Sequence, residues 1–218
     1  MLVFNRIEKL KSFLKELKKQ GKIIGFVPTM GALHRGHVSL IKASIKQCDV
    51  TVCSIFVNPT QFNDKSDFDK YPATLEADLK KLKAAKCDMV FAPSVAEMYP
   101  DGFGNTRKID FGFLAETLEG EHRPGHFNGM AQVVEMLLRI VQPHCLFMGQ
   151  KDYQQQLIVA QLIKKRKLKT RLVTCATLRE KDGLAMSSRN VRLDKKARKL
   201  AVEISKTDRA GCWRRGWR

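Results

Sequence analysis

Short apolar runs alternate with longer helical patterns along this chain, and this alternation constrains the fold more than any other feature. Apolar and β-branched residues cluster where buried strands are expected, at residues 23–27, 50–57, 88–92, 145–148 and 171–175. Helical spacing marks the other segments, at residues 7–20, 38–45, 72–82, 130–141 and 153–167. Strands that alternate with helices pair in parallel through right-handed crossovers. We therefore predict an α/β fold with a doubly wound parallel sheet, and we expect residues 108–113 to form an edge strand.

The charge of the chain is strongly positive but unevenly distributed. The 218 residues carry a formal net charge of +18, and most of the excess of Lys and Arg lies after residue 160. A basic core would favour nucleic acid as a partner, whereas the nearly balanced core argues against it. No apolar run approaches the roughly 20 residues of a membrane-spanning helix, and no signal-peptide core precedes Lys9. We expect a cytoplasmic protein without a membrane partner.

The six cysteines are scattered singly and lack the spacing of a zinc site. Cys53, Cys145 and Cys175 lie inside expected strands, where a free thiol behaves as a small hydrophobic group. We expect reduced cysteines with no catalytic role, and the sequence does not identify any metal ligands.

The loop after the strand expected at residues 23–27 combines two histidines with a glycine where a helix begins. In a doubly wound sheet, ligands bind beyond the carboxyl ends of the strands. The first backbone N–H groups of a helix have no partner within the helix, and the helix dipole is positive there. His34 and His37 would add imidazole donors around a polyphosphate, and Gly36 would let a nucleotide approach the backbone. The alternative is a pair of surface histidines in an ordinary loop.

Two further loops carry polar side chains at the carboxyl ends of strands. Asn58 and Gln61 follow the second strand, and their neutral amides suit the hydroxyl and carboxylate groups of a small substrate. Gln61 could equally be a solvated loop residue. Lys151, with Asp152 beside it, would stabilise the negative charge of a phosphoryl transition state. The alternative for Lys151 is a surface charge, and Gln155 lies one helical turn beyond it.

A fourth element places two hydroxyl groups beside a guanidinium. Ser187 and Ser188 precede Arg189, which can grip two phosphate oxygens at once. The alternative is a helix N-cap, because serine favours that position.

Taken together, these loops resemble the pantothenate synthetase family, also called the pantoate-β-alanine ligases. The likeness runs in order through residues 27–31, 34–37, 54–62, 123–127, 151–155 and 182–190. The regions around His34 and Ser188 also resemble the signature loops of class I aminoacyl-tRNA synthetases. The resemblance implies a Rossmann-like domain of the nucleotidyltransferase type at residues 1–176, which binds ATP and pantoate. It also implies that residues 177–218 begin a small C-terminal lid domain.

The resemblance implies a two-step reaction and a set of site residues. Pantoate attacks the α-phosphorus of ATP, and β-alanine then attacks the pantoyl adenylate to give pantothenate and AMP. Mg²⁺ and a homodimer are implied as well. His34, His37 and Lys151 would be catalytic, with His37 the proton donor and the phosphate-bound histidines protonated. Asn58, Gln61, Gln155 and Met30 would bind pantoate or β-alanine. ATP would contact Pro28, Thr29, Met30, Gly31, His34, Gly36, His37, Gly149, Lys151, Asp152, Met186, Ser187, Ser188 and Arg189.

The chain departs from the family pattern at its end, because residues 209–218 match nothing in it. Premature termination or a frameshift is the main expectation, and a basic tail that binds RNA is the alternative. The sequence leaves open a ligase, a shortened form that binds ATP and pantoate but turns over poorly, a related His-x-Gly-His nucleotidyltransferase, and a basic nucleic-acid-binding module. The first is favoured by residues 58–61 and 151–155, and the balanced core disfavours the last.

Overall fold

The computed structural model describes residues 1–62, 68, 71–72, 74–103 and 109–209. These residues contain a six-stranded sheet in the order β1-β4-β3-β2-β5-β6, in which all neighbouring strands are parallel. The strands are β1 (Leu2–Phe4), β2 (Ile24–Thr29), β3 (Val50–Ile55), β4 (Met89–Phe91), β5 (Cys145–Gly149) and β6 (Arg171–Cys175). The predicted α/β fold with a parallel sheet is confirmed.

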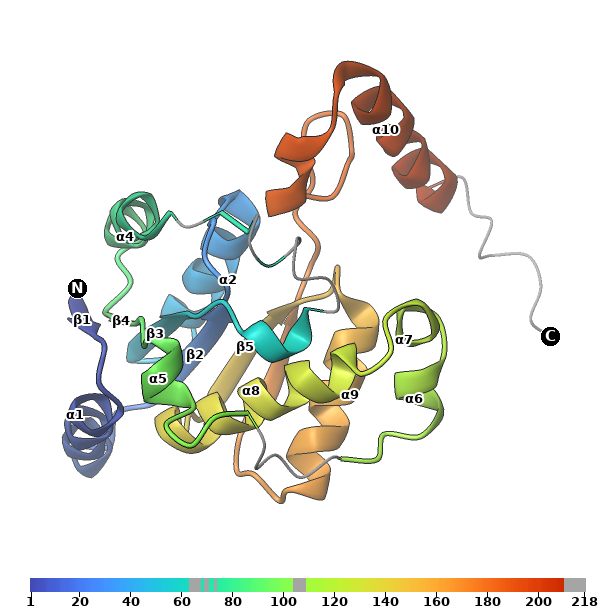
Figure 1. The fold of residues 1–218 in the computed structure, drawn as a ribbon. Coiled ribbons are helices and arrows are strands. Elements are labelled where there is room, and N and C mark those ends of the chain that lie inside the picture. Colours follow the sequence, from blue (N-terminus) through green and yellow to red (C-terminus); the bar gives the residue numbers. More distant parts are fainter. Residues whose placement is uncertain (63–67, 69–70, 73, 104–108, 210–218) are drawn as a thin grey trace.

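Helices cover both faces of the sheet, as a doubly wound fold requires. One apolar cluster joins the sheet to α1 (Ile7–Lys19), α8 (His126–Val141) and α9 (Tyr153–Lys165). A second cluster, on the other face, joins it to α2 (Arg35–Ile45) and α4 (Leu75–Ala84). Figure 1 shows α2 and α4 on the side of the sheet away from α8. Shorter elements are η1 (Pro59–Gln61), α5 (Val95–Met98), α6 (Phe113–Glu116), α7 (Glu119–His122) and η2 (Ser188–Arg192), and α10 (Lys195–Arg209) comes last.

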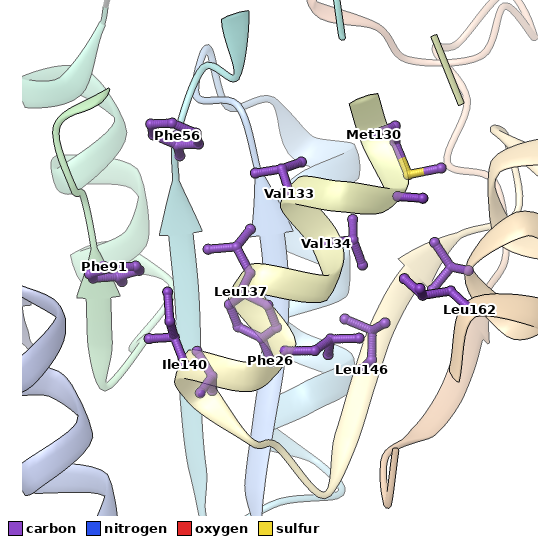
Figure 2. Packing of buried hydrophobic residues seen from close by; sticks show 14 of the residues in the cluster. Phe26, Phe56, Phe91, Met130, Val133, Val134, Leu137, Ile140, Leu146 and Leu162 are labelled. Atoms are coloured by element: carbon purple, nitrogen blue, oxygen red, sulfur yellow. The ribbon is translucent and has the colours of Figure 1, made fainter. Parts of the chain in front are cut away.

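The larger apolar cluster is built around α8. Figure 2 shows Val134 and Leu137 of this helix directed at Phe26 and Leu146 on the neighbouring strands β2 and β5. Full burial of each such side chain contributes about 1.5–3 kcal/mol to folding. On the opposite face, Gly25 allows α2 to approach β2, because a Cβ at this position would lie 2.1 Å from Ser44 Oγ. The central strands are therefore fixed tightly from both sides.

Two details of the fold differ from the sequence prediction. Strand β1 was not expected, because it is three residues long and exposes the side chains of Leu2 and Val3. The edge strand expected at residues 108–113 is absent from the described residues 109–113, and residue 108 lies outside them. Ile109 and Phe111 are buried in the main cluster, so their apolar character reflects packing of an irregular segment. The basic tail at residues 210–218 also lies outside the described residues, and the expectations about it stay predictions.

The order of the strands fixes where a ligand can bind. The chain runs outward from β2 in both directions, to β3 and β4 on one side and to β5 and β6 on the other. The loops that follow β2 and β5 consequently diverge at neighbouring carboxyl ends, and such a switch point is where open α/β sheets bind ligands. After β6, an antiparallel bridge between Arg179 and Ala185 turns the chain back, while α10 stands apart from the sheet (Figure 1). No helix among the described residues has both the length and the apolar content needed to cross a bilayer.

Candidate active site

A pocket of about 380 Å³ opens at this switch point. It gathers residues from all four loops that the sequence singled out, together with the N-terminal half of α8. The predicted residues that line it are Pro28, Thr29, Met30, His34, Gly36, His37, Gln61, Gly149, Lys151, Asp152, Gln155, Met186, Ser187, Ser188 and Arg189. Gly31 and Asn58 were predicted as contacts but are not among its lining residues. Both support the walls of the pocket from behind.

His34 and His37 hold each other at the start of α2. His34 is the N-cap, and its Nδ1 accepts a hydrogen bond from the backbone N–H of Gly36 at 3.1 Å. The Nδ1 of His37 accepts from the backbone N–H of His34 at 3.2 Å, and the two ring centroids are 4.0 Å apart. An accepting Nδ1 carries no proton, so each neutral ring is protonated at Nε2. Each histidine therefore offers one Nε2–H donor to the pocket that both rings line.

The surroundings keep both imidazoles neutral. Burial is the main cause that lowers the pKa of His37 to about 3, and the positive charges nearby, including Lys151, lower it further. Burial and then Lys151 also lower the pKa of His34. The expectation of protonated histidines concerned the phosphate-bound state and stays a prediction, whereas both rings are neutral in the protein without nucleotide. Both side chains act here as neutral hydrogen-bond donors.

Four backbone N–H groups of the loop that was expected to cradle phosphates have partners within the protein. The N–H groups of Ala32 and Leu33 donate to the carboxylate of Asp78, at 2.8 and 2.7 Å. The N–H groups of His34 and Gly36 are engaged by the two imidazoles. Since these four donors have partners within the protein, the histidine side chains replace them as the groups that face the pocket.

Gly36 has a role in the structure in addition to the predicted one, which stays a prediction. A Cβ on Gly36 would lie 2.8 Å from Cε1 of His34 and 2.9 Å from its Nδ1. Both distances are well inside van der Waals contact, so the absence of a side chain at Gly36 makes room for the imidazole of His34. Met186 lies on the same side, with its Cβ 3.6 Å from that position.

The amide pair after β3 is anchored to α8. Asn58 is buried; its Nδ2 donates to the carbonyl of Gly129 at 3.2 Å, and its Oδ1 accepts from the hydroxyl of Tyr99 at 2.8 Å. The Nε2 of Gln61 lies 2.7 Å from the sulfur of Met30, so the second loop meets the first inside the pocket. Asn58 therefore supports the second loop and does not itself line the pocket, whereas Gln61 is the amide that lines it.

The loop after β5 brings a cation and an amide to the same pocket. Lys151 is partly exposed, and its Nζ pairs with a carboxylate oxygen of Asp152 at 2.7 Å. Gln155 lines the pocket one turn into α9. Behind them, the side chain of the buried Gln156 donates to the carbonyl of Gly149 and accepts from the hydroxyl of Thr174. This buried amide fixes the end of β5 relative to α9.

The C-terminal segment closes one wall of the pocket. Ser187 is the N-cap of η2, and its Oγ accepts from the backbone N–H of Arg189 at 3.2 Å. The capping alternative is therefore realised at Ser187, although the residue also lines the pocket. Ser188 forms a hydrogen bond with the side chain of Tyr71, whose pKa is raised mainly by burial. That contact joins the segment to the loop that precedes α4.

Sequence reasoning missed four polar residues that build the site: Asp78, Tyr71, His126 and Gln156. Asp78 interrupts the apolar stripe of α4, which is a signal that could have been noticed. The Nδ1–H of His126 donates to the carbonyl of Gln61 at 2.8 Å, and burial lowers the pKa of this imidazole. No group of three or more His, Cys, Asp or Glu side chains among the described residues has the arrangement of a metal site.

Comparisons with known proteins identify the family to which this chain is similar. Residues 2–211 match the family model described as pantoate-beta-alanine ligase. A pantothenate synthetase of Porphyromonas gingivalis is 50% identical over 206 residues, which are 94% of this chain and 73% of that protein. One from Acetivibrio thermocellus is 49% identical over 207 residues, with 95% and 73% covered. The crystal structure of the Francisella tularensis pantoate-beta-alanine ligase, complexed with beta-gamma ATP and beta-alanine, matches with a TM-score of 0.89 and 44% identity, over 96% of this chain and 79% of that one.

Proposed function

The chain belongs to the pantoate-beta-alanine ligase family, and from this we infer the reaction that takes place in the pocket. It is an ATP-dependent ligase that condenses pantoate with β-alanine to form pantothenate, AMP and pyrophosphate. One observation carries the assignment of this chemistry to the pocket: phosphate-binding donors and two substrate-type amides line the same cavity. The donors are His34, His37 and Lys151, and the amides are Gln61 and Gln155.

The first step joins the carboxylate of pantoate to the α-phosphorus of ATP. A carboxylate oxygen forms the new O–P bond, and the bond from the α-phosphorus to the bridging oxygen breaks, which releases pyrophosphate with its electron pair. The Nε2–H groups of His34 and His37 and the ammonium of Lys151 would stabilise the charge that accumulates on the phosphate oxygens. Arg189 would bind the same oxygens from the C-terminal segment.

The second step uses the mixed anhydride made in the first. The free amine of β-alanine attacks the acyl carbon, the C–O bond to AMP breaks, and the amine loses one proton. Gln61 and Gln155 would hold the pantoyl group by its hydroxyls, against the apolar wall formed by Val133, Val134 and Leu137. Enclosure matters because water would hydrolyse the adenylate before the amine arrives.

If Mg²⁺ binds in this pocket, the phosphates of the substrate would supply more of its ligands than the protein would. Asp152 is a carboxylate on the pocket wall beside Lys151, and no larger group of acidic ligands accompanies it among the described residues. A magnesium ion prefers one or two carboxylates together with phosphate oxygens and water. We therefore assign Asp152 as the protein group that would approach the ion, which supplies charge neutralisation on the triphosphate.

The remaining features follow from the family. We propose that residues 1–176 form the domain that binds ATP and pantoate, and that residues from 177 onward belong to the lid domain, which contributes Met186 to Arg189. A cytoplasmic location and a homodimer are part of the same proposal.

The exchange of labelled pyrophosphate into ATP tests the function directly. The expected result is exchange that requires pantoate, and formation of pantothenate once β-alanine is added. A related nucleotidyltransferase would exchange pyrophosphate with another acceptor and not with pantoate. Exchange without any requirement for pantoate would overturn the proposed assignment.

A further inference from the structure

A buried carboxylate lies beneath the histidine loop. Asp78, on α4, has no exposed surface, and both of its oxygens are engaged. Oδ1 accepts from the backbone N–H of Leu33 at 2.7 Å, and Oδ2 accepts from the backbone N–H of Ala32 at 2.8 Å and from the hydroxyl of Thr74 at 3.0 Å. The Nζ of Lys81 is 3.9 Å from Oδ1. A carboxylate enclosed in this way is fixed, and it is kept from binding an external cation.

The loop above Asp78 adopts a conformation that needs such a partner. Gly31 and Ala32 both have a positive φ, of 84° and 48°. A positive φ is unfavourable for alanine, so the surrounding contacts must hold it. Successive N–H groups in such a turn converge on a common point and form a concave anion site. Here the carboxylate of Asp78 occupies that site.

Helix α4 holds the carbonyl side of the loop as well. The Nζ of Lys81 donates to the carbonyl of Leu33 at 2.5 Å. Both backbone polar groups of Leu33 are therefore bound by one turn of α4, through Asp78 and Lys81. The residue that follows Leu33 is His34, whose backbone N–H and imidazole begin the reciprocal hydrogen bonds with His37 and Gly36. These hydrogen bonds of Leu33 with Asp78 and Lys81 therefore fix the position of His34.

We propose that Asp78 is a positioning residue for adenylate formation: it holds the turn at residues 31–33 so that His34 and His37 keep their Nδ1 atoms on the backbone and present Nε2–H to the phosphates. The proposal rests on the function proposed above for the pocket. Asp78 acts through the loop and touches no substrate. Its effect should therefore reach the chemical step through the orientation and tautomer of two imidazoles.

Asp78→Asn is the sharpest test, because it preserves the size of the side chain. The amide has one acceptor oxygen for two backbone N–H groups, and its NH₂ would face the second of them. We expect pantoate-dependent pyrophosphate exchange to fall about 100-fold, as misplacement of groups near the reaction does. Nitrogen-15 NMR of the imidazoles should show pure Nε2–H tautomers in the parent protein and a mixture of tautomers in the variant.

Thr74→Val is the matched control. It removes one hydrogen bond to the same carboxylate and leaves the two from Ala32 and Leu33 in place. We expect exchange within about twofold of the parent and unchanged tautomers, even if the melting temperature falls. An equal loss of exchange in both variants would mean that Asp78 only stabilises the fold.

Lys81→Met covers the case in which Asp78→Asn does not fold, since Lys81 is partly exposed and methionine retains the apolar stem. It should lower exchange several-fold and alter the tautomer of His34. The proposal is refuted if folded Asp78→Asn keeps the pyrophosphate exchange and the histidine tautomers of the parent. If Asp78→Asn is unfolded, the same result in Lys81→Met refutes it. Failure of the parent protein to exchange pyrophosphate would instead refute the proposed function, and the tautomer measurements would still test the role of Asp78.

Discussion

Replacing Gly36 with alanine should separate the stability of the protein from its rate of adenylate formation. Gly36 lies in the first turn of α2, where alanine is intrinsically the better helix former. The new Cβ would lie 2.8 Å from Cε1 of His34 and 2.9 Å from its Nδ1, so the ring must move while the helix backbone can stay. The strain therefore falls on the imidazole that we assign to the phosphates.

The magnitudes predict a small effect on stability and a larger one on rate. Alanine contributes up to about 1 kcal/mol in helix propensity, and loss of the bond from the Gly36 N–H to His34 costs about 0.5–1.5 kcal/mol. The free energy of unfolding should thus change by less than about 1 kcal/mol. Ordinary contact begins at 3.4 Å, so the ring must retreat by roughly half an ångström. Such a displacement corresponds to a rate loss of about tenfold.

Pyrophosphate exchange and urea unfolding, measured on the same samples, check this separation. The decisive comparison is a double-mutant cycle with His34→Ala. If the effect of Gly36→Ala passes through the ring, it should largely vanish in the variant that lacks the ring. An undiminished tenfold loss on top of His34→Ala would refute the reasoning, and would point back to the approach of the nucleotide to the backbone.

Three further predictions concern other parts of the pocket. The pKa of His37 falls from 6.5 to about 3 on folding, so the neutral ring contributes stability above pH 6.5. This contribution is lost as the pH falls toward 3. Thermal melts should therefore show a steeper loss of stability on acidification in the parent protein than in His37→Gln. Lys151→Ala should slow pyrophosphate exchange by about 100-fold with little change in ATP affinity measured by calorimetry, and parent-like exchange would exclude the assigned role. Gly129→Ala places a Cβ 2.3 Å from the carbonyl oxygen of Thr60, beside Gln61. It should therefore raise the KM for pantoate and lower the free energy of unfolding by about 1–3 kcal/mol. An unchanged KM would contradict the anchoring of Gln61 by α8.

Periodicity was sufficient to predict the layers of the fold but not all of its edges. The central strands are buried on both faces, and mostly apolar, β-branched runs such as that at residues 50–57 reveal them. Strand β1 gave no such signal, because an edge strand of three residues with exposed Leu2 and Val3 has no pattern to detect. The opposite error occurred at Ile109 and Phe111, whose alternation looked like a strand although both side chains fill the core from an irregular segment. In such segments a buried side chain does not indicate a regular strand or helix.

The site was predictable in its location but not in its internal contacts. Three of the four loops could be chosen because their polar clusters followed a strand, and the carboxyl ends of parallel strands meet at one edge. The sequence could not show that the N–H groups of Ala32 and Leu33 are already bound, since their partner Asp78 comes from a different helix. Nor could it show that His34 and His37 cap one another through Nδ1, because this depends on ring orientation. Spacing identifies which residues meet, whereas tautomer and protonation depend on the surrounding structure.

The charges of the pocket explain why neutral histidines suit this site. Burial, and after it the positive charges nearby such as Lys151, lower the pKa values of His34 and His37, so two further cations in this cavity would destabilise the folded protein. Neutral Nε2–H groups bind phosphate oxygens without adding to the repulsion. On the proposed roles, the negative charge of an entering triphosphate raises the pKa of a nearby imidazole, so the ring can take up a proton from solvent and pass it to the departing pyrophosphate. The substrate itself would thus supply the negative charge that favours the protonated form of the ring, which is the form that can act as a general acid.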